Sequence, residues 1–515
     1  MMRKITMCIA VLLVAAILAG CGGGSGTNQS ASVDFEVTTD GSYPIETDET
    51  ITYWTQLHES VAASVNSLNE TEFGKQLIEQ TGINVEFIHP PVTQVTERFN
   101  LMIASREFPD IIEWSWYSFP GGPHTAIADD IILPLNSVFE KVAPNLTQIL
   151  EERPEVAQDI RTDEGEYYAF PMIRETDYLN TYFGPMFRKD LLDQTGLEVP
   201  ETIDEWDTVL YALKDIGVKV PLMLTLDNNR LKSCSPFLGA YGVAGSFYVD
   251  NGTVKFGPYE EEPYTEFVTL LTRWYQDGIL DPDFIDTDNS RFSALGLSGT
   301  WGVSFASCGG NFGAWIPAIQ QSNPEADFVP AKYPVLNKGE TPKFGQKSFD
   351  AEPRAAISAQ CKNVELAARL LDYGYSDAGF LLYNFGKEGE SYTMVDGVPT
   401  YTELITNNEK PMSYMIGLYA RSSYFGPMVQ AEKYMRQYAK LDVQKEGIEV
   451  WMQNENTDHI LPNVTLTADE NTEYSKIMAD IDTYRQEMLY NFITGTISLD
   501  RLPEYFATMK DMGIE

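Results

Sequence analysis

The chain has 515 residues, of which 43% are hydrophobic and 12% aromatic, so it is long enough to bury the cores of two or three domains. The formal net charge is −39. Residues 1–20 hold two of the 36 basic residues and no acid, so the rest of the chain carries −41. A field of this sign repels nucleic acid and anionic lipid headgroups, and we expect no binding of nucleic acid.

The first twenty residues have the pattern of a secretory signal peptide. A basic head, Arg3-Lys4, precedes an apolar run from Met7 to Leu18, which is shorter than the ~20 residues of a membrane span. Cys21 directly follows Leu-Ala-Gly, which resembles the lipobox of bacterial lipoproteins. The resemblance implies that Cys21 is lipidated and holds the protein at the extracellular face of the cytoplasmic membrane, in a Gram-positive bacterium.

Beyond Cys21, residues 21–49 are rich in Gly, Ser, Thr, Asn and Asp, and we expect a flexible tether. The next hundred residues alternate between strand and helix patterns. The expected strands lie at 51–54, 83–88 and 109–112, and the expected helices at 70–81 and 94–105. This alternation predicts a parallel sheet flanked by helices, in which ligands bind beyond the carboxyl ends of the strands.

The clearest helix signal lies near residue 202. Thr202 and Glu205 have the spacing of a capping box, and an apolar stripe follows. That stripe comprises Trp206, Val209, Leu210 and Leu213. Trp206 is therefore expected in the core. A second capping box at 467–470 predicts a helix that continues to about residue 492.

Signatures of catalysis and metal binding are absent from the sequence. The four His include no pair at i, i+4, and neither a G-x-S-x-G elbow nor a Walker A loop occurs. Cys234, Cys308 and Cys361 do not have the spacing of zinc ligands. The alternatives are three buried thiols or one disulfide bond between two of them. An acidic run offers ligands for Ca²⁺, but it departs from the EF-hand pattern, so we expect a turn and a helix cap there and no cofactor. This run comprises Asp281, Asp283, Asp286 and Asp288.

Five separated motifs carry a family resemblance. They are Pro109 to Ile112, Arg188 to Trp206, Trp274 to Phe284, Ala367 to Tyr373 with Gly386 to Tyr392, and Phe492 to Leu499. Together they resemble the family 1 extracellular solute-binding proteins of bacterial ABC importers, in the LipO-like lipoprotein branch. Ser391 departs from this pattern, because the family often has His at that position.

The resemblance implies a two-lobed α/β fold of the periplasmic-binding-protein type. Each lobe would be a mixed sheet flanked by helices, with the ligand cleft between the lobes. We expect lobe 1 at 50–165 with a return at 346–395, and lobe 2 at 166–345 with a return and C-terminal helices at 396–515. The implied partners are an oligosaccharide and the transmembrane permease of an ABC importer, and we expect a monomer.

Aromatic residues suggest where the ligand binds, because Trp and Tyr rings stack on the C–H faces of sugars while polar groups bind the hydroxyls. The chain has 8 Trp, 28 Tyr and 26 Phe. The aromatic candidates are Trp54, Trp114, Trp116, Tyr117, Tyr182, Trp301 and Trp315. The polar candidates are Glu113, Asp350 and Arg354. Burial in the core is the alternative for the Trp residues, and a structural salt bridge is the alternative for Arg354.

These features favour a lipid-anchored subunit that captures a carbohydrate by lobe closure and makes or breaks no bond. A surface glycoside hydrolase is one alternative, since acid pairs are plentiful in so acidic a chain. A peptide-binding importer subunit is another, although it makes less use of the many aromatic residues.

Overall fold

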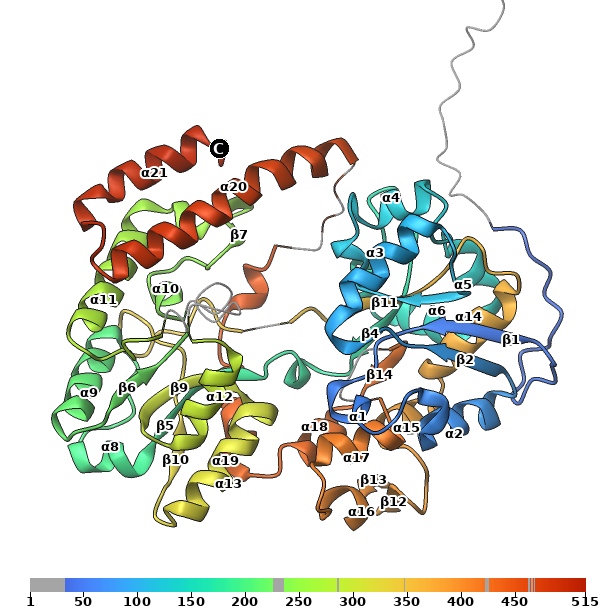
Figure 1. The fold of residues 1–515 in the computed structure, drawn as a ribbon, viewed down its shortest axis with the longest axis horizontal. Helices are drawn as coiled ribbons and strands as arrows, with labels where there is room; N and C mark the ends of the chain where they lie inside the picture. The colour runs from blue at the N-terminus through green and yellow to red at the C-terminus, as the bar shows by residue number, and fades with distance from the viewer. Residues whose placement is uncertain are drawn as a thin grey trace, which may run out of the picture.

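The computed structural model describes residues 33–225, 236–284, 287–346, 348–421, 426–461, 464, 466 and 468–515. These residues form two lobes, each built around its own sheet with helices beside it (Figure 1). Lobe 1 contains a six-stranded sheet and lobe 2 a four-stranded sheet. The predicted two-lobed α/β fold is therefore confirmed. The predicted lipidation site, Cys21, lies outside the described residues.

The sheet of lobe 1 contains the strand–helix alternation predicted from the sequence. Its strands, in order across the sheet, are β14 (Met428–Gln430), β4 (Phe170–Arg174), β11 (Ala351–Ile357), β3 (Ile111–Glu113), β1 (Thr50–Trp54) and β2 (Asn84–Ile88). Strand β11 is antiparallel to both neighbours, and the other pairs are parallel. The parallel strands therefore all end at one edge, and the chain crosses to lobe 2 from that edge, after β4.

Helices flank this sheet and continue into a small subdomain at its end (Figure 1). The helices of lobe 1 are α1 (Glu59–Ala62), α2 (Glu72–Thr81), α3 (Val95–Ser105), α4 (Gly122–Ala128), α5 (Asn136–Val142), α6 (Pro144–Glu152), α7 (Pro154–Asp159), α14 (Val364–Asp372), α15 (Asp377–Phe385), α16 (Glu403–Thr406), α17 (Met412–Tyr419) and α18 (Glu432–Tyr438). A hairpin of β12 (Tyr392–Val395) and β13 (Val398–Tyr401) belongs to the subdomain.

Lobe 2 is built on the sheet β10-β5-β9-β6 and a separate hairpin, β7–β8. Its strands are β5 (Phe183–Arg188), β6 (Val220–Met223), β7 (Phe247–Asp250), β8 (Thr253–Phe256), β9 (Trp301–Ser307) and β10 (Phe328–Pro330). Its helices are α8 (Lys189–Thr195), α9 (Ile203–Asp215), α10 (Pro236–Ala240), α11 (Glu261–Gln276), α12 (Asn289–Ser298), α13 (Gly313–Ser322), α19 (Asp442–Trp451), α20 (Ala468–Ile493) and α21 (Leu502–Asp511). Within the described ranges, no helix is both long and apolar enough to cross a membrane.

The capping box predicted for α9 is present. The Thr202 hydroxyl accepts from the Glu205 N–H at 3.2 Å, and the Glu205 carboxylate accepts from the Thr202 N–H at 3.2 Å. Two otherwise unpaired N–H groups at the start of the helix are thereby satisfied. Trp206 is fully buried in the core of lobe 2, as expected from the apolar stripe.

Residues 33–49 correct the prediction of a flexible tether, because they lie along lobe 1. Glu365 on α14 accepts from the backbone N–H groups and hydroxyls of Thr38 and Thr39 at 2.6–3.1 Å. Ile45 is buried, and its N–H donates to the carbonyl of Thr81. The prediction went wrong because the composition of this segment does not reveal its partners in lobe 1, which are the Glu365 carboxylate, the Arg369 carbonyl that accepts from Tyr43, and the Thr81 carbonyl that accepts from Ile45.

Two lobe boundaries also differ from the prediction. Strand β4 begins at Phe170 and belongs to lobe 1, so the crossing to lobe 2 lies later than residue 166. The chain after 396 remains in lobe 1, because β14 pairs with β4 and the apolar sides of α16, α17 and α18 pack with Phe385 of α15. The return to lobe 2 begins only with α19, which packs on β5 and β10.

Candidate ligand site between the lobes

A cavity of about 770 Å³ lies between the two lobes. This volume falls in the range of roughly 300–1,000 Å³ that ligand sites occupy. Lobe 1 contributes Tyr117 and the start of α4, and the β7–β8 hairpin and α20 contribute from lobe 2. In the ribbon, the first turns of α20 lie beside α4 of lobe 1, and β7 lies on the lobe 2 side (Figure 1).

The part of the cavity wall that the structure describes is rich in aromatic rings. Its rings are Tyr117, Phe247, Tyr248, Tyr333, Phe344, Phe349 and Tyr474. Its polar side chains other than tyrosine are Ser246, Asn456, His459 and Asn471. Among the described residues that line the cavity, none is Asp, Glu, Lys or Arg. Flat rings with a few uncharged hydrogen-bonding groups match the chemistry of a neutral sugar.

Hydrogen bonds to the backbone fix several of these polar side chains. Nδ1 of His459 lies 3.0 Å from the carbonyl oxygen of Val249, which can only accept, so Nδ1 carries a proton and donates it in this hydrogen bond. The amide of Asn456 donates to the carbonyl of Gly345 at 2.8 Å. The cavity wall is therefore preorganised, which lowers the entropy lost when a ligand binds.

The chain segments that cross between the lobes lie beside the cavity and are bonded to one another. Asn180 donates from its side chain to Asp350 at 2.7 Å. The Tyr182 N–H donates to the Gln346 side chain at 2.8 Å, and the Ser348 N–H donates to the carbonyl of Asn180 at 2.9 Å. Asp350, predicted as a ligand residue, is thus a partner within this hinge.

Of the ten predicted ligand residues, Tyr117 lines the large cavity and Tyr182 lines a smaller one of about 220 Å³. The smaller cavity lies among α17, α18 and the Gly309-Gly310 turn. In the view of Figure 1, α17 and α18 lie below the segments that cross between the lobes, and α4, β7 and the first turns of α20 lie above them. The two predicted tyrosines therefore face different spaces.

Trp54, Trp114 and Trp116 form an aromatic cluster with Phe99 of α3, next to the carboxyl ends of β1 and β3. The ring of Trp114 stacks on Phe99 with centroids 4.1 Å apart. Trp116 is fully buried and donates to the carbonyl of Arg354 at 3.2 Å, and Trp54 is 5% exposed. Trp54 and Trp116, predicted as ligand residues, are therefore buried, and their rings pack α3 against the edge of the sheet.

Trp301 and Trp315 are also core residues, which corrects their prediction as ligand residues. They are 0% and 1% exposed, and their ring centroids lie 6.2 Å apart in the core of lobe 2. The Trp301 ring N–H donates to the carbonyl of Gly296 at 2.9 Å. Both residues flank a glycine-rich turn, but β9 and α13 direct the two rings into the lobe.

The polar candidates Glu113 and Arg354 are held in ion pairs. Arg421 donates to both oxygens of Glu113 at 3.0 and 3.1 Å, and the Tyr53 hydroxyl donates to the same carboxylate at 2.7 Å. Burial lowers the pKa of Arg421, but the Glu113 charge outweighs it and raises that pKa above its usual range. Arg354 pairs with Glu352, the structural alternative considered for it. Neither candidate lines a described cavity.

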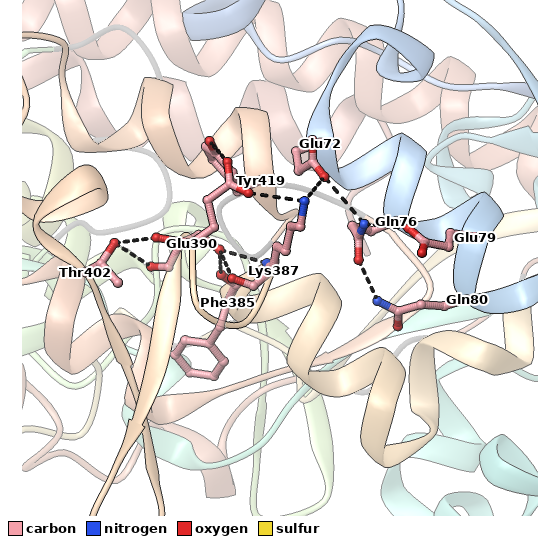
Figure 2. A network of polar contacts seen from close by, with 10 residues as sticks. Glu72, Gln76, Glu79, Gln80, Phe385, Lys387, Glu390, Thr402 and Tyr419 are labelled. Atoms are coloured by element: carbon pink, nitrogen blue, oxygen red, sulfur yellow. Dashed lines mark hydrogen bonds and ion pairs between the residues drawn. The ribbon is translucent and has the colours of Figure 1, made fainter.

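The loop around Ser391 has a structural role in lobe 1. The buried Ser391 hydroxyl donates to the carbonyl of Phe385 at 2.7 Å and accepts from the Lys387 N–H at 2.8 Å. Lys387 in turn pairs with Glu72 of α2 and with Glu390 (Figure 2). The Ser391 side chain thus stabilises this loop through hydrogen bonds to its backbone, at a position where the resemblance predicts His.

Residues of the acidic run after residue 280 form ion pairs and a hydrogen bond with Arg291. The guanidinium lies 2.6 Å from Asp283 and 3.7 Å from Asp281, and Asp288 caps α12 by accepting from the Arg291 N–H. The predicted turn and helix cap are confirmed, and Asp286 lies outside the described residues. In the part of the chain that the structure describes, no cluster of three His, Cys, Asp or Glu side chains could hold a metal ion. Cys308 and Cys361 are free thiols, and Cys234 lies outside the described residues.

Comparison with known proteins shows the family to which the chain belongs. Residues 66–379 match the family model described as bacterial extracellular solute-binding protein, which is more than half of the chain. The chain therefore belongs to the bacterial extracellular solute-binding protein family.

Individual relatives are distant but cover nearly the whole chain. The fructooligosaccharide ABC transporter substrate-binding protein FusA of Streptococcus pneumoniae is 24% identical, over 92% of this chain and 89% of the relative. Lipoprotein LipO of Bacillus subtilis is 23% identical, over 82% of each chain. Among solved structures, the alginate-binding protein AlgQ2 without calcium ion is 21% identical, with a TM-score of 0.72 over 91% of this chain and 96% of that one. FusA in complex with kestose is 21% identical, with a TM-score of 0.71 over 90% of this chain and 96% of that one.

Proposed function

We propose that this protein is the extracellular subunit of an ABC importer that captures a neutral oligosaccharide between its lobes and delivers it to the permease. The observation that carries the proposal is the interlobe cavity of about 770 Å³, with its seven aromatic rings and its uncharged polar groups. The name of one relative supports an oligosaccharide ligand, since FusA is named for fructooligosaccharides.

Charge narrows the ligand class to neutral sugars. A uronate would bring one carboxylate for each unit into a cavity whose described lining offers no Lys or Arg. The net charge of −39 adds a long-range repulsion. An anionic chain would therefore lose its hydration without gaining an ion pair, which is costly.

The cavity lining also argues against the two alternatives. A glycoside hydrolase needs two carboxyl groups beside the scissile bond, and the described lining contains none. A peptide brings a charged amine and carboxylate that require ionic partners, which the described lining also lacks. Capture is then a matter of binding alone, in which the ligand favours the closed arrangement of the lobes by its contacts with both.

Titration calorimetry of the purified chain tests this proposal. We expect heat of binding with at least one neutral oligosaccharide and none with matched uronate oligosaccharides, and chromatography of the mixture should recover the sugar uncut. Binding of uronates or peptides alone would overturn the ligand class. Release of reducing ends would overturn the proposal that the protein only binds.

The anchor at Cys21 is part of the proposal. Since residues 33–49 are held on lobe 1, the folded part of the chain begins closer to Cys21 than the sequence predicted. Cys21→Ala should release the protein into the medium with its sugar affinity unchanged. Retention of the variant on cells would contradict lipid anchoring at this residue.

A further inference from the structure

Helix α20 is unusual in this molecule because it reaches from one lobe to the other. It spans the 26 residues Ala468–Ile493, a length of about 39 Å at 1.5 Å per residue. Its C-terminal half belongs to lobe 2, where Ile481, Phe492 and Ile493 are buried and α20 packs against α11 and α21. Its N-terminal end touches α4 of lobe 1 (Figure 1).

The first turns of α20 form part of the cavity wall. Asn471 and Tyr474 both line the cavity, and the Tyr474 side chain is 44% exposed. The Tyr474 ring centroid lies 6.2 Å from that of Phe247 on the β7–β8 hairpin. A large aromatic ring left this exposed beside a cavity, with other rings near it, is typical of a surface that covers a ligand.

Lobe 1 completes this end of the cavity with Tyr117, Gly122 and Pro123. The Tyr117 ring is held in place, since its hydroxyl donates to the carbonyl of Asp159 and it packs edge-on against Tyr168 at 6.2 Å. Gly122 has open space within 4 Å of where a Cβ would lie, so the backbone at the start of α4 is accessible to a ligand. Each lobe therefore places a tyrosine in the wall of this end of the cavity.

We propose that the first turns of α20 hold the terminal unit of the bound oligosaccharide. Tyr474 covers a face of that sugar ring, and Asn471 binds its hydroxyls. Because α20 touches α4 here, the cavity ends at this contact, and the α20 residues select ligands by their end unit. This inference rests on the proposed function, since it takes the large cavity as the sugar site.

Calorimetry on three single variants of the full chain, with neutral oligosaccharides of two to six units, tests the inference. Tyr474→Ala should weaken binding by about three- to tenfold, the loss expected when a stacked aromatic ring is removed. Asn471→Ala should weaken it by about fivefold, the equivalent of one lost hydrogen bond. Tyr490→Ala is the matched control, because Tyr490 is 39% exposed on the same helix and is not part of the described cavity wall.

The possible results separate the two proposals. Weaker binding by Tyr474→Ala, with an unchanged melting temperature and an unaffected Tyr490→Ala, supports the inference. If the wild type binds sugar and Tyr474→Ala binds equally well, the role of α20 is overturned and the proposed function stands. If the wild type binds no sugar, both are overturned.

Discussion

Glu113 and Arg421 form a bidentate ion pair across 308 residues of sequence, with both side chains 5% exposed. The carboxylate lies at the end of β3, and the guanidinium follows α17. Two residues near the end of β1 bind to this pair. The Tyr53 hydroxyl donates to Glu113, and Arg421 donates to the Thr55 hydroxyl. It therefore joins the returning part of lobe 1 to the edge of the sheet that faces lobe 2.

Removal of one partner should destabilise the protein strongly. Arg421→Ala leaves the Glu113 carboxylate buried without its cation, and we expect a loss of about 3–5 kcal/mol in the free energy of unfolding. Urea denaturation followed by circular dichroism measures this change. Arg501→Ala, which breaks a pair with Glu504 in which both side chains are more than half exposed, should cost less than about 1 kcal/mol. Equal losses in the two variants would contradict a special role for the buried pair.

The contact between residues 33–49 and lobe 1 should weaken in acid. Burial by itself would raise the pKa of Glu365. Hydrogen bonds from Thr39, Thr38 and Arg369 outweigh burial and lower this pKa from 4.5 to about 2. A carboxyl group whose pKa is depressed by folding adds stability above its unfolded pKa. That contribution is lost as the pH falls from about 4.5 toward 2.

Glu365→Gln isolates this contribution. The urea midpoint of the variant should fall below that of the wild type at pH 7, and the difference should shrink by pH 3. Limited proteolysis at pH 7 should cut residues 33–49 faster in the variant. Glu46→Gln is the control, since Glu46 lies in the same segment with an exposed side chain. A difference that does not depend on pH would show that the Glu365 charge is not what holds the segment.

Local signals in the sequence predicted local structure well. The capping box at Thr202 set the start of α9, and the strand–helix alternation from 51 to 112 gave the parallel strands of lobe 1. Each of these signals depends on residues a few positions apart. The two-lobed fold itself came from motifs spread along the chain, and the family match agrees with it.

The site was predicted poorly for a physical reason. Trp301 beside a glycine-rich turn looks the same in sequence whether its ring enters the core or faces a cleft. Only the packing of β9 against α12, and of its Trp301 ring against Trp315 of α13, places it in the core. Phe344, His459 and Tyr474 line one cavity, although Phe344 and Tyr474 lie 130 positions apart in the sequence. No periodicity links them, so tertiary structure was needed to find them.

The position of Trp301 in the core of lobe 2, and not in the ligand site, can be tested through protein stability. Trp301→Ala should lower the free energy of unfolding by about 3–5 kcal/mol, since a fully buried ring is removed from the core of lobe 2. Its folded fraction should bind sugar with the Kd of the wild type. Thermal unfolding and calorimetry measure the two effects on one preparation. A weakened Kd with unchanged stability would restore Trp301 as a ligand residue.

Substitutions of Tyr117 and Tyr182 test which of the two cavities binds the ligand. Tyr117 lines the cavity of about 770 Å³, and Tyr182 lines the one of about 220 Å³. If the larger cavity is the site, Tyr117→Ala should weaken sugar binding by about 1 kcal/mol, or roughly fivefold in Kd, through loss of ring contact. Tyr117→Phe should stay within about twofold, because it keeps the ring and loses only the hydrogen bond to Asp159. Tyr182→Ala should leave the Kd unchanged. The reverse result, with a loss only in Tyr182→Ala, would place the ligand on the other side of the crossing segments.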